Sequence, residues 1–298
     1  MKARIIINPT AGRQMLQKNV DKIINKMLSD RIITNADIIK TQGAGDAYQA
    51  ARYFKPWEAN LLIVVGGDGT VNEVVNGFMD GSHTTPLAIY PAGTVNDFAS
   101  SLRLPRDVTD FCDMIRQMKT RMIDVGRAGN HYFLNVAAGG MLTDVAYKVP
   151  SEAKTVLGKL AYLISGAIDL QSQRFKPVHV QIVSEERTVH EDILLFIVSN
   201  SNSVGGFRYM APKASVSDGL LDVLVIHKQN IFELMPVLMQ MVNGDHITNS
   251  RITYFQTKHI EISCEDGCKI PLDLDGEQGS NLPTRIDVKP KALTLIVP

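Results

Sequence analysis

Five consecutive aliphatic residues at 61–65 run directly into Gly66-Gly67-Asp68-Gly69, and this junction constrains the fold more than any other part of the chain. A short aliphatic run ended by a glycine turn is typical of a strand buried on both faces of a parallel sheet. Further strand-like runs lie at 4–7, 36–40 and 87–90, and helix-like patterns lie at 16–28, 46–54 and 71–79. This alternating order predicts a three-layer α/β domain built on a mainly parallel sheet.

The pattern of apolar residues changes after residue 125. Strand-like runs then dominate, at 178–183, 193–199, 220–226, 259–263 and 293–297, with helix-like patterns at 157–168 and 231–242. So few helices among the strands favour an antiparallel, β-rich sandwich. We therefore expect an α/β domain over 1–125 and a β-rich domain over 126–290, with the strand near 290–298 as a candidate to return to the first domain.

Composition narrows the class of protein. The chain has 298 residues, of which 45% are hydrophobic, and its 31 Lys+Arg balance 31 Asp+Glu. These values exclude a disordered or collagen-like chain, and a neutral chain lacks the basic footprint of a nucleic-acid binder. The three cysteines form no spaced framework, and no apolar run approaches the roughly 20 residues of a spanning helix. We expect a cytoplasmic protein without a transmembrane segment.

The pentapeptide Gly66-Gly67-Asp68-Gly69-Thr70 is the sharpest local motif. Glycines between a strand and a helix let backbone amides approach an anion, and the helix N-terminus favours a phosphate there. Asp68 would repel a phosphate unless a cation lies between them, which indicates Mg²⁺. The alternative is a tight turn capped by an aspartate. The sequence of this turn matches neither the Walker pattern nor the dinucleotide fingerprint.

A second loop, 91–98, follows the strand at 87–90 and has a similar composition. Gly93 and Thr94 offer amides and a hydroxyl, while Asn96 and Asp97 offer oxygen ligands or, alternatively, a helix cap. Loops that follow neighbouring parallel strands converge at one edge of the sheet, where α/β proteins bind ligands. The turn after the first strand lies at this edge too, and its Arg13 is either a phosphate ligand or a solvated charge.

Several motifs together closely resemble the diacylglycerol kinase catalytic superfamily. They are Asn8-Pro9 with Gly12, the 66–70 pentapeptide, the 91–98 block, and the segments 123–126, 135–140, 218–222 and 275–277. The resemblance extends over essentially the whole chain. The soluble bacterial diacylglycerol kinases look nearest, and the sphingosine kinases are more distant.

The resemblance implies a role for each matching residue. The residues expected to bind ATP are Asn8, Gly12, Arg13, Thr41, Gly66, Gly67, Asp68, Gly69, Thr70, Asn72, Gly93, Thr94 and Asn96. Asp68 would act through Mg²⁺, Asp97 and Asp124 would belong to the acidic network around the metal and the acceptor, and Glu277 would be the general base.

A second, structural Mg²⁺ would lie at Ser215, Asp218 and Leu220. The alternative at this place is a bare Asp-Gly turn. Relatives often carry a basic residue soon after Asn-Asp-Phe. Here Ser100 and Ser101 occupy that region, and the first cation is Arg103.

The expected activity is transfer of the ATP γ-phosphate to a lipid hydroxyl, converting diacylglycerol to phosphatidic acid. Because Glu277 follows Asp68 by 209 residues, we expect an interdomain cleft with a nucleotide-binding first domain and a lipid-substrate second domain. The alternatives are a kinase of sphingoid or isoprenoid alcohols, an NAD kinase, and a non-catalytic nucleotide sensor. The resemblance also suggests ATP rather than GTP as donor, and a homodimer.

Local charge fits a peripheral lipid enzyme. Residues 1–40 hold eight Lys/Arg and three Asp/Glu, whereas residues 261–280 hold one Lys and six acids. Cations attract phosphates and anionic headgroups, and carboxylates serve Mg²⁺ and the proton. The sequence therefore predicts transient, reversible contact with a membrane surface.

Overall fold

A computed structural model describes residues 1–11, 14–140, 177–205, 207–265 and 270–298. Gly12, Arg13 and the helical pattern expected at 157–168 lie outside the described residues. The chain divides into two compact units, here called unit 1 (1–125 and 290–298) and unit 2 (126–289).

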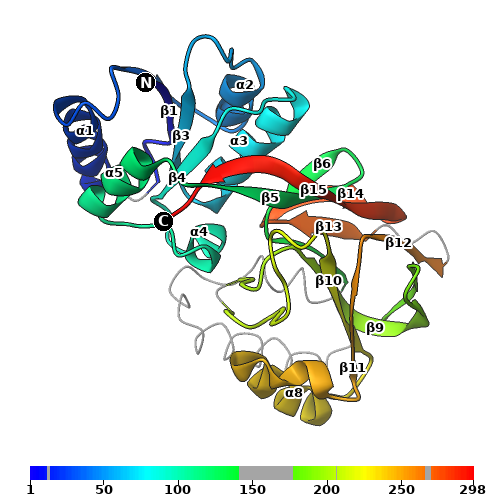
Figure 1. Ribbon diagram of the computed structural model, residues 1–298. Coiled ribbons are helices and arrows are strands. Elements are labelled where there is room, and N and C mark those ends of the chain that lie inside the picture. The colour runs from blue at the N-terminus through cyan, green and yellow to red at the C-terminus, as the bar shows by residue number, and fades with distance from the viewer. Residues whose placement is uncertain (12–13, 141–176, 206, 266–269) are drawn as a thin grey trace. The chain divides into compact units, whose positions relative to one another are not determined.

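Unit 1 is a parallel sheet between two layers of helices (Figure 1). Its elements are β1 (Lys2–Ile7), α1 (Gln14–Ser29), β2 (Asn35–Lys40), α2 (Asp46–Arg52), β3 (Leu61–Gly66), α3 (Asp68–Asp80), β4 (Leu87–Pro91), α4 (Asp97–Ser101), α5 (Val108–Gln117) and the start of β5 (Thr120–Ala128). The strand order is β2-β1-β3-β4-β15, and each of these pairings is parallel. Figure 1 shows α1 and α5 on one side of this sheet and α2 and α3 on the other.

The central strand explains why this half of the chain forms three layers. Every residue of β3 is buried, so both of its faces need an apolar cover. On one face α3 provides that cover with Val71, Val74, Val75 and Phe78, which recur at helical spacing. The fold predicted from the aliphatic run at 61–65 is confirmed.

Unit 2 is β-rich, and its strands pair antiparallel with one another. Its elements are the end of β5, β6 (His131–Phe133), β7 (Val136–Gly140), β8 (Val178–Val183), β9 (Thr188–Ser199), β10 (Leu221–His227), α8 (Ile231–Asn243), the 3-10 helix η2 (Asp245–Thr248), β11 (Ile252–Thr257), β12 (His259–Cys264), β13 (Pro271–Leu274), β14 (Glu277–Asn281) and most of β15 (Thr284–Ile296). Pro290–Pro298, the end of β15 and the residues after it, belong to unit 1, where Leu295 pairs with Leu87 of β4.

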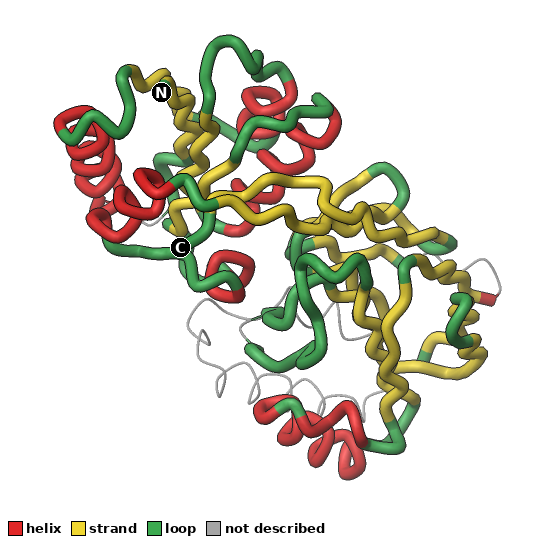
Figure 2. The backbone as a smooth tube through the Cα atoms, in the orientation of Figure 1, coloured by secondary structure: helices red, strands yellow, loops and turns green. Residues whose placement is uncertain are grey.

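The long strand β9 separates two apolar cores in unit 2. Ile193, Phe196 and Val198 join one core, whereas Leu194 and Ile197 join the other, which lies under α8. The pairing with β10 changes register at Leu194, and here two successive residues, Leu194 and Leu195, pack on the core under α8. Figure 2 shows α8 as the long helix of this unit. It begins with a capping box formed by Asn230 and Glu233.

Two further observations concern single elements. Among the described residues, no helix combines the length and the apolar character needed to cross a bilayer. Cys112 is buried and free, whereas Cys264 is disulfide-bonded. A bonded Cys264 was not expected from the sequence, in which the three cysteines form no spaced framework.

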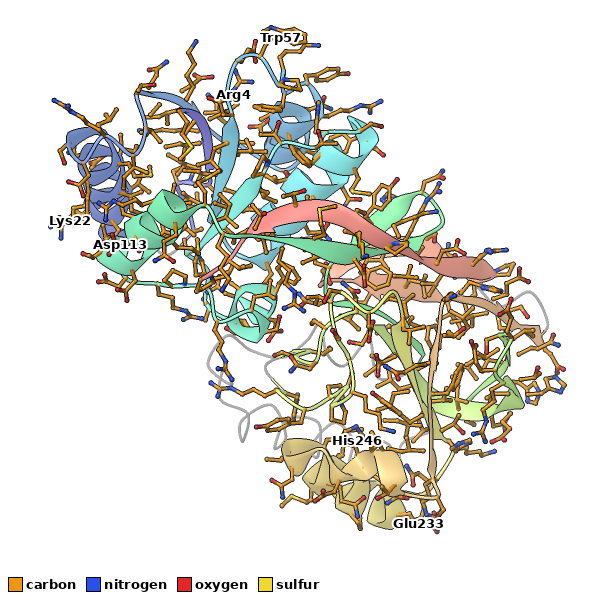
Figure 3. The ribbon with its side chains drawn as sticks, in the orientation of Figure 1. Arg4, Lys22, Trp57, Asp113, Glu233 and His246 are labelled. Atoms are coloured by element: carbon orange, nitrogen blue, oxygen red, sulfur yellow. The ribbon has the colours of Figure 1, made fainter. Side chains whose placement is uncertain are left out.

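His246 gives unit 2 a pH-dependent stability. His246 belongs to η2 and is labelled in Figure 3, and its side chain is fully buried. The Nε2–H group donates to the Met210 carbonyl at 2.9 Å. Burial holds the pKa of His246 below its ordinary value of 6.5. As the pH falls through 6.5, the unfolded chain takes up this proton and the folded chain does not. We expect the free energy of unfolding to fall by up to about 2 kcal/mol between pH 7 and pH 5.

His246→Gln keeps a donor for the Met210 carbonyl and removes the titration. Urea denaturation at several pH values should therefore show a decline in the wild type that is smaller in this variant. Parallel pH profiles for the two proteins would contradict this origin of the pH dependence.

Candidate active site

Polar and glycine residues follow the carboxyl ends of four neighbouring strands of unit 1. Asn8 follows β1 and Thr41 follows β2, where the Thr41 N–H donates to the Ile7 carbonyl at 2.9 Å. The loop after β4 joins the end of β3, because the Ala92 N–H donates to the Gly66 carbonyl at 2.9 Å. These strands are parallel, so the four segments lie at one edge of the sheet, where α/β proteins bind ligands.

The loops after β3 and β4 touch at two glycines. A Cβ at Gly93 would lie 2.6 Å from the Cα of Gly67 and 2.9 Å from Oδ1 of Asn96. A Cβ at Gly67 would lie 3.1 Å from the Cα of Gly93. Only residues without side chains allow the two backbones to approach this closely. The structure thus brings together the two motifs that the sequence singled out separately.

Asp68 and Asn96 fasten the two loops to each other. The backbone N–H of Asn96 donates to Oδ2 of Asp68 at 2.8 Å. The Asn96 side chain bonds Gly93 twice, accepting from its N–H at 2.9 Å and donating to its carbonyl at 2.7 Å. Asn96 precedes α4 with φ of 54°, and its side chain makes no capping hydrogen bond to that helix. The alternative prediction of a helix-capping side chain is therefore wrong for Asn96, which shapes the loop instead.

The turn after β1 is joined to the same place through Thr70. The Asn8 side-chain amide donates to the Thr70 hydroxyl at 2.9 Å. Gly66 leaves room for that threonine, because a Cβ there would lie 2.5 Å from the Cβ of Thr70. Asn8 also accepts from the Thr10 N–H and hydroxyl at 3.0 and 2.7 Å. Three loops are consequently held together by side chains from the predicted set.

The remaining predicted residues of these loops lie on or beside α3 and α4. Gly67 precedes α3 and offers no capping side chain, while Asp68 and Gly69 form the first turn of the helix. Asn72 lies one turn further, where its carbonyl and Oδ1 accept from the Asn76 amide at 3.0 Å. Thr94 is exposed. The positive end of the α3 dipole therefore lies where the glycine loops meet.

Arg106 is a cation that the sequence reasoning missed. Its guanidinium donates to the Val95 carbonyl at 3.2 Å and to the Ser100 hydroxyl at 3.4 Å. The chain reverses before it, with Arg103 at φ of 55°, and the Tyr90 hydroxyl donates to the Arg106 carbonyl at 2.8 Å. A positive charge thus reaches the loop after β4, although Ser100 and Ser101 occupy the positions where the resemblance leads us to expect a cation.

Asp124 and Asp97 occupy different surroundings. Asp124 lies within β5 and is fully buried, and its Oδ1 accepts from the Lys291 N–H at 2.7 Å. Asp124 is therefore part of a strand and not of a turn. Asp97 is the first residue of α4 and is half-buried. Asp124 is thus fixed against β15, whereas Asp97 lies beside the Asn96 junction.

Glu277 begins β14 in unit 2, directly after a two-residue turn. Asp275 and Gly276 have φ of 55° and 94°, as a type I′ hairpin turn requires, and Leu274 pairs with Glu277 across it. The Asp275 carboxylate accepts three backbone N–H groups, from Leu134 at 2.7 Å, Asn135 at 2.9 Å and Val136 at 2.8 Å. Asp275 therefore fixes the hairpin that carries the exposed Glu277.

A buried polar network also forms hydrogen bonds to residues 134 and 135. The Asn200 amide donates to the Leu134 carbonyl at 2.8 Å, and the Ser201 hydroxyl donates to Oδ1 of Asn135 at 2.7 Å. Asn200 and Ser201 are almost fully buried. Because buried polar groups stabilise only when they are paired, this network specifies one position for the segment that anchors Asp275.

We expect Asp275→Ala to destabilise unit 2 by about 3–5 kcal/mol, because three backbone N–H groups lose their acceptor. Asp273→Ala is the matched control, since within the described part of the chain its Oδ1 accepts a single backbone N–H, that of Gly276 at 2.8 Å. Urea denaturation of the two variants measures the difference. Equal stability of both variants would show that Asp275 is no anchor.

The residues expected at a structural metal lie in the turn before β10. Oδ1 of Asp218 accepts from the Leu220 N–H at 3.0 Å, and Ser215 lies a short distance before it in the chain. Asp222 in β10 is almost fully buried and accepts from the Tyr254 hydroxyl and, at 3.2 Å, from the Gln256 amide. Burial raises the pKa of the Asp222 carboxyl to about 6. The carboxylate oxygens and carbonyls of this turn are the donors that Mg²⁺ prefers.

Known proteins resemble both halves of the chain. The model of the diacylglycerol kinase catalytic domain matches residues 2–128, and the model of the YegS C-terminal NAD kinase beta sandwich-like domain matches residues 136–297. The diacylglycerol kinase of Bacillus subtilis (strain 168) is 39% identical over 283 residues, which cover 95% of this chain and 91% of that protein.

A second diacylglycerol kinase sequence and a crystal structure are also similar to this chain over most of its length. The diacylglycerol kinase of Staphylococcus carnosus (strain TM300) is 36% identical over 282 residues, covering 95% of this chain and 90% of that protein. A crystal structure of a diacylglycerol kinase from Bacillus anthracis str. Sterne has a TM-score of 0.80 at 27% identity and covers 100% of this chain and 97% of that one. The predicted fold class is confirmed, and the resemblance read from the motifs holds along the whole length: the chain belongs to the diacylglycerol kinase family.

Proposed function

We propose that the protein transfers the γ-phosphate of ATP to the hydroxyl of diacylglycerol and forms phosphatidic acid. One observation carries the proposal: the Asp68 carboxylate is held by the Asn96 N–H where two glycine loops meet, at the carboxyl ends of parallel strands. ATP is the expected phosphate donor because the chain belongs to a kinase family, and diacylglycerol is the expected acceptor because the relatives are named for it.

The phosphates would lie against the glycines of unit 1, which is the nucleotide-binding domain in this proposal. A Cβ would collide at Gly93 and would be tightly packed at Gly67, so the backbone of both loops is accessible only without side chains, and the N-terminus of α3 attracts negative charge. The segments at this edge of the sheet also carry the hydroxyl groups of Thr41, Thr70 and Thr94, of which Thr94 is the most exposed. Asn8 and Asn72 would support these segments. Arg106 adds a positive charge at the loop after β4.

The donor set at this junction fits Mg²⁺, because Asp68 and Asp97 offer carboxylate oxygens beside a cradle that only glycines can form. When bound there, Mg²⁺ would neutralise the negative charge of the phosphates during transfer. Asp68 would hold the metal, Asp97 would join it, and the buried Asp124 would act as a positioning residue through β15. Ser215, Asp218 and Leu220 would hold a second Mg²⁺ with a structural role.

Glu277 would act as the general base. As the lipid hydroxyl oxygen attacks the γ-phosphorus, the bond from phosphorus to the β–γ bridging oxygen breaks and ADP leaves. Glu277 takes the hydroxyl proton, and its exposed carboxylate on a rigid hairpin suits that task. Unit 2 is then the lipid-substrate domain, and Asp275 is the positioning residue for the base.

The acceptor lies in a membrane, so the enzyme would work by transient contact with the bilayer surface from the cytoplasm. Basic residues concentrated in 1–40 would attract anionic headgroups. A homodimer is the oligomeric state suggested by the resemblance, and light scattering coupled to gel filtration tests it.

An acceptor panel tests the proposed function. The purified chain is incubated with Mg²⁺ and ATP labelled in the γ-phosphate, together with micelles of diacylglycerol, ceramide, sphingosine, monoacylglycerol or an isoprenoid alcohol, or with NAD. We expect the largest kcat/KM for diacylglycerol. A larger kcat/KM for another lipid would show that diacylglycerol is not the preferred substrate. Formation of labelled NADP would identify an NAD kinase. Nucleotide binding without any labelled product would identify a nucleotide sensor.

Glu277→Gln should lower kcat by about 10²–10⁴-fold, because the hydroxyl proton loses its acceptor. Glu261→Gln is the matched control, an exposed carboxylate on β12 with no role in this mechanism. Steady-state rates with diacylglycerol micelles measure both variants. An active Glu277→Gln enzyme would remove this residue from the chemistry.

A further inference from the structure

Three side chains of metal-ligating types gather on one face of unit 2, and none of them has been assigned a role above. They are His179 on β8, His190 on β9 and Glu265, which follows the end of β12. Along β8 the neighbours Val180 and Ile182 enter the apolar core, so His179 lies on the opposite, solvent-facing side. The three strands are neighbours in the order β9-β8-β12, which places one group on each.

The pairing registers explain why the side chains meet. On β9, Asp192 lies opposite His179 and His190 lies opposite Gln181, so the two histidines are diagonal neighbours on one face. Their rings stand edge to face with centroids 4.7 Å apart. On the other side of β8, Cys264 pairs with Val180, so Glu265 continues along β12 toward His179.

The distances suit a small divalent cation. Oε1 of Glu265 lies 3.1 Å from Nε2 of His190 and 3.7 Å from Nε2 of His179. One ligand atom from each of the three residues lies within 4.8 Å of the others. Tetrahedral zinc, with bonds of about 2.0–2.1 Å, separates its ligand atoms by about 3.3 Å. Small side-chain adjustments would therefore complete three of four coordination positions.

A carboxylate outside this group orients one of the ligands. Nδ1 of His179 lies 2.9 Å from Oδ1 of Asp192, whose Oδ2 accepts from Lys228 at 3.1 Å. The hydrogen bond from His179, together with Lys228, lowers the pKa of the Asp192 carboxyl. Asp192 therefore fixes the tautomer with a proton on Nδ1, and Nε2 is the nitrogen turned toward Glu265. Histidine ligands of zinc are commonly held by a carboxylate in this way.

This arrangement favours a cation between the rings and the carboxylate. With its Nδ1 proton donated to Asp192, a neutral His179 ring directs an Nε2 lone pair at a carboxylate oxygen. A metal ion placed between the ring nitrogens and the carboxylate would accept lone pairs from all three groups.

We propose that His179, His190 and Glu265 bind a zinc ion, with water as the fourth ligand. Two imidazoles and one carboxylate are a zinc donor set, whereas Mg²⁺ prefers oxygen donors only. The ion would tie β8, β9 and the residue after β12 together on the solvent side of unit 2. The three ligands belong to unit 2, whereas the phosphate-binding loops belong to unit 1.

Zinc titration of the full chain by calorimetry, after removal of metals with EDTA, tests the site. We expect one high-affinity equivalent in the wild type, undiminished by millimolar Mg²⁺. His190→Ala removes a ligand and Asp192→Asn removes the orienting carboxylate, and we expect the latter to weaken zinc binding by about 10–100-fold. His131→Ala, an exposed histidine on β6, is the matched control and should bind zinc like the wild type.

Thermal unfolding supplies a second readout that does not depend on enzyme activity. Zinc should raise the melting temperature of the wild type and of His131→Ala, and leave that of His190→Ala unchanged, because only a bound ion stabilises the folded state. Equal melting temperatures of the metal-free proteins show that each variant folds. Unchanged zinc affinity in His190→Ala would overturn the proposal.

Discussion

Asp68→Asn is expected to lower kcat/KM for phosphate transfer by roughly 10³-fold, mostly through kcat, because the carboxylate charge acts on the transferring phosphate. The variant keeps an oxygen at the position that accepts the Asn96 N–H, which lies 2.8 Å from Oδ2 in the wild type. The junction of the two loops should therefore survive, and the loss should report the charge alone.

Asp80→Asn is the matched control for this prediction. Asp80 ends the same helix, is exposed, and accepts a hydrogen bond from the Tyr48 hydroxyl at 2.7 Å. Initial rates with labelled ATP and diacylglycerol, together with melting temperatures, compare the two variants. An Asp68→Asn enzyme with wild-type kcat would refute the role of Asp68, and equal inactivation of Asp80→Asn would show that the rate reports general damage to α3.

Gly93→Ala should separate the loops after β3 and β4. The new Cβ would lie 2.6 Å from the Cα of Gly67 and 2.9 Å from Oδ1 of Asn96, and a backbone atom cannot move aside as a flexible side chain does. We expect a loss of about 1–3 kcal/mol of stability, as for other overpacked positions. Activity should fall by roughly 10²-fold, because a displacement of about 1 Å is enough for a loss of this size.

Gly43→Ala is the matched control, since a Cβ at Gly43 meets nothing within 4 Å. It lies in the loop after β2 and should leave both stability and rate close to those of the wild type. Denaturation curves and the phosphate-transfer assay measure the pair. A Gly93→Ala enzyme as active as Gly43→Ala would mean that the two loops need not touch for catalysis.

The sequence predicted unit 1 better than unit 2, and the reason is physical. The aliphatic run at 61–65 needs cover on both faces, so it specifies a parallel sheet with helices on either side. In unit 2 several strands carry little local signal. β7 reads Val-Ala-Ala-Gly-Gly, and β15 was predicted only from 293 because Pro290, between Lys289 and Lys291, interrupts its apolar pattern.

The two phosphate-loop motifs could be found from the sequence, because glycines between a strand and a helix are local signals. Their contacts could not. Arg106 reaches the loop after β4 only because the chain reverses at Arg103, and the three partners of Asp275 lie about 140 residues away. An Asp-Gly pair gives a turn signal whether or not the aspartate binds distant backbone, so only the fold reveals an anchor.

Hydrogen–deuterium exchange of the full chain, with and without Mg²⁺ and a non-hydrolysable ATP analogue, tests most directly where the nucleotide phosphates bind. We predict slower exchange of the backbone amides in 66–70 and 92–96, and loss of that protection in Asp68→Ala. Protection of another segment, with unchanged exchange in both glycine loops, would contradict the assignment of the phosphate site to the junction of β3, β4 and Asp68.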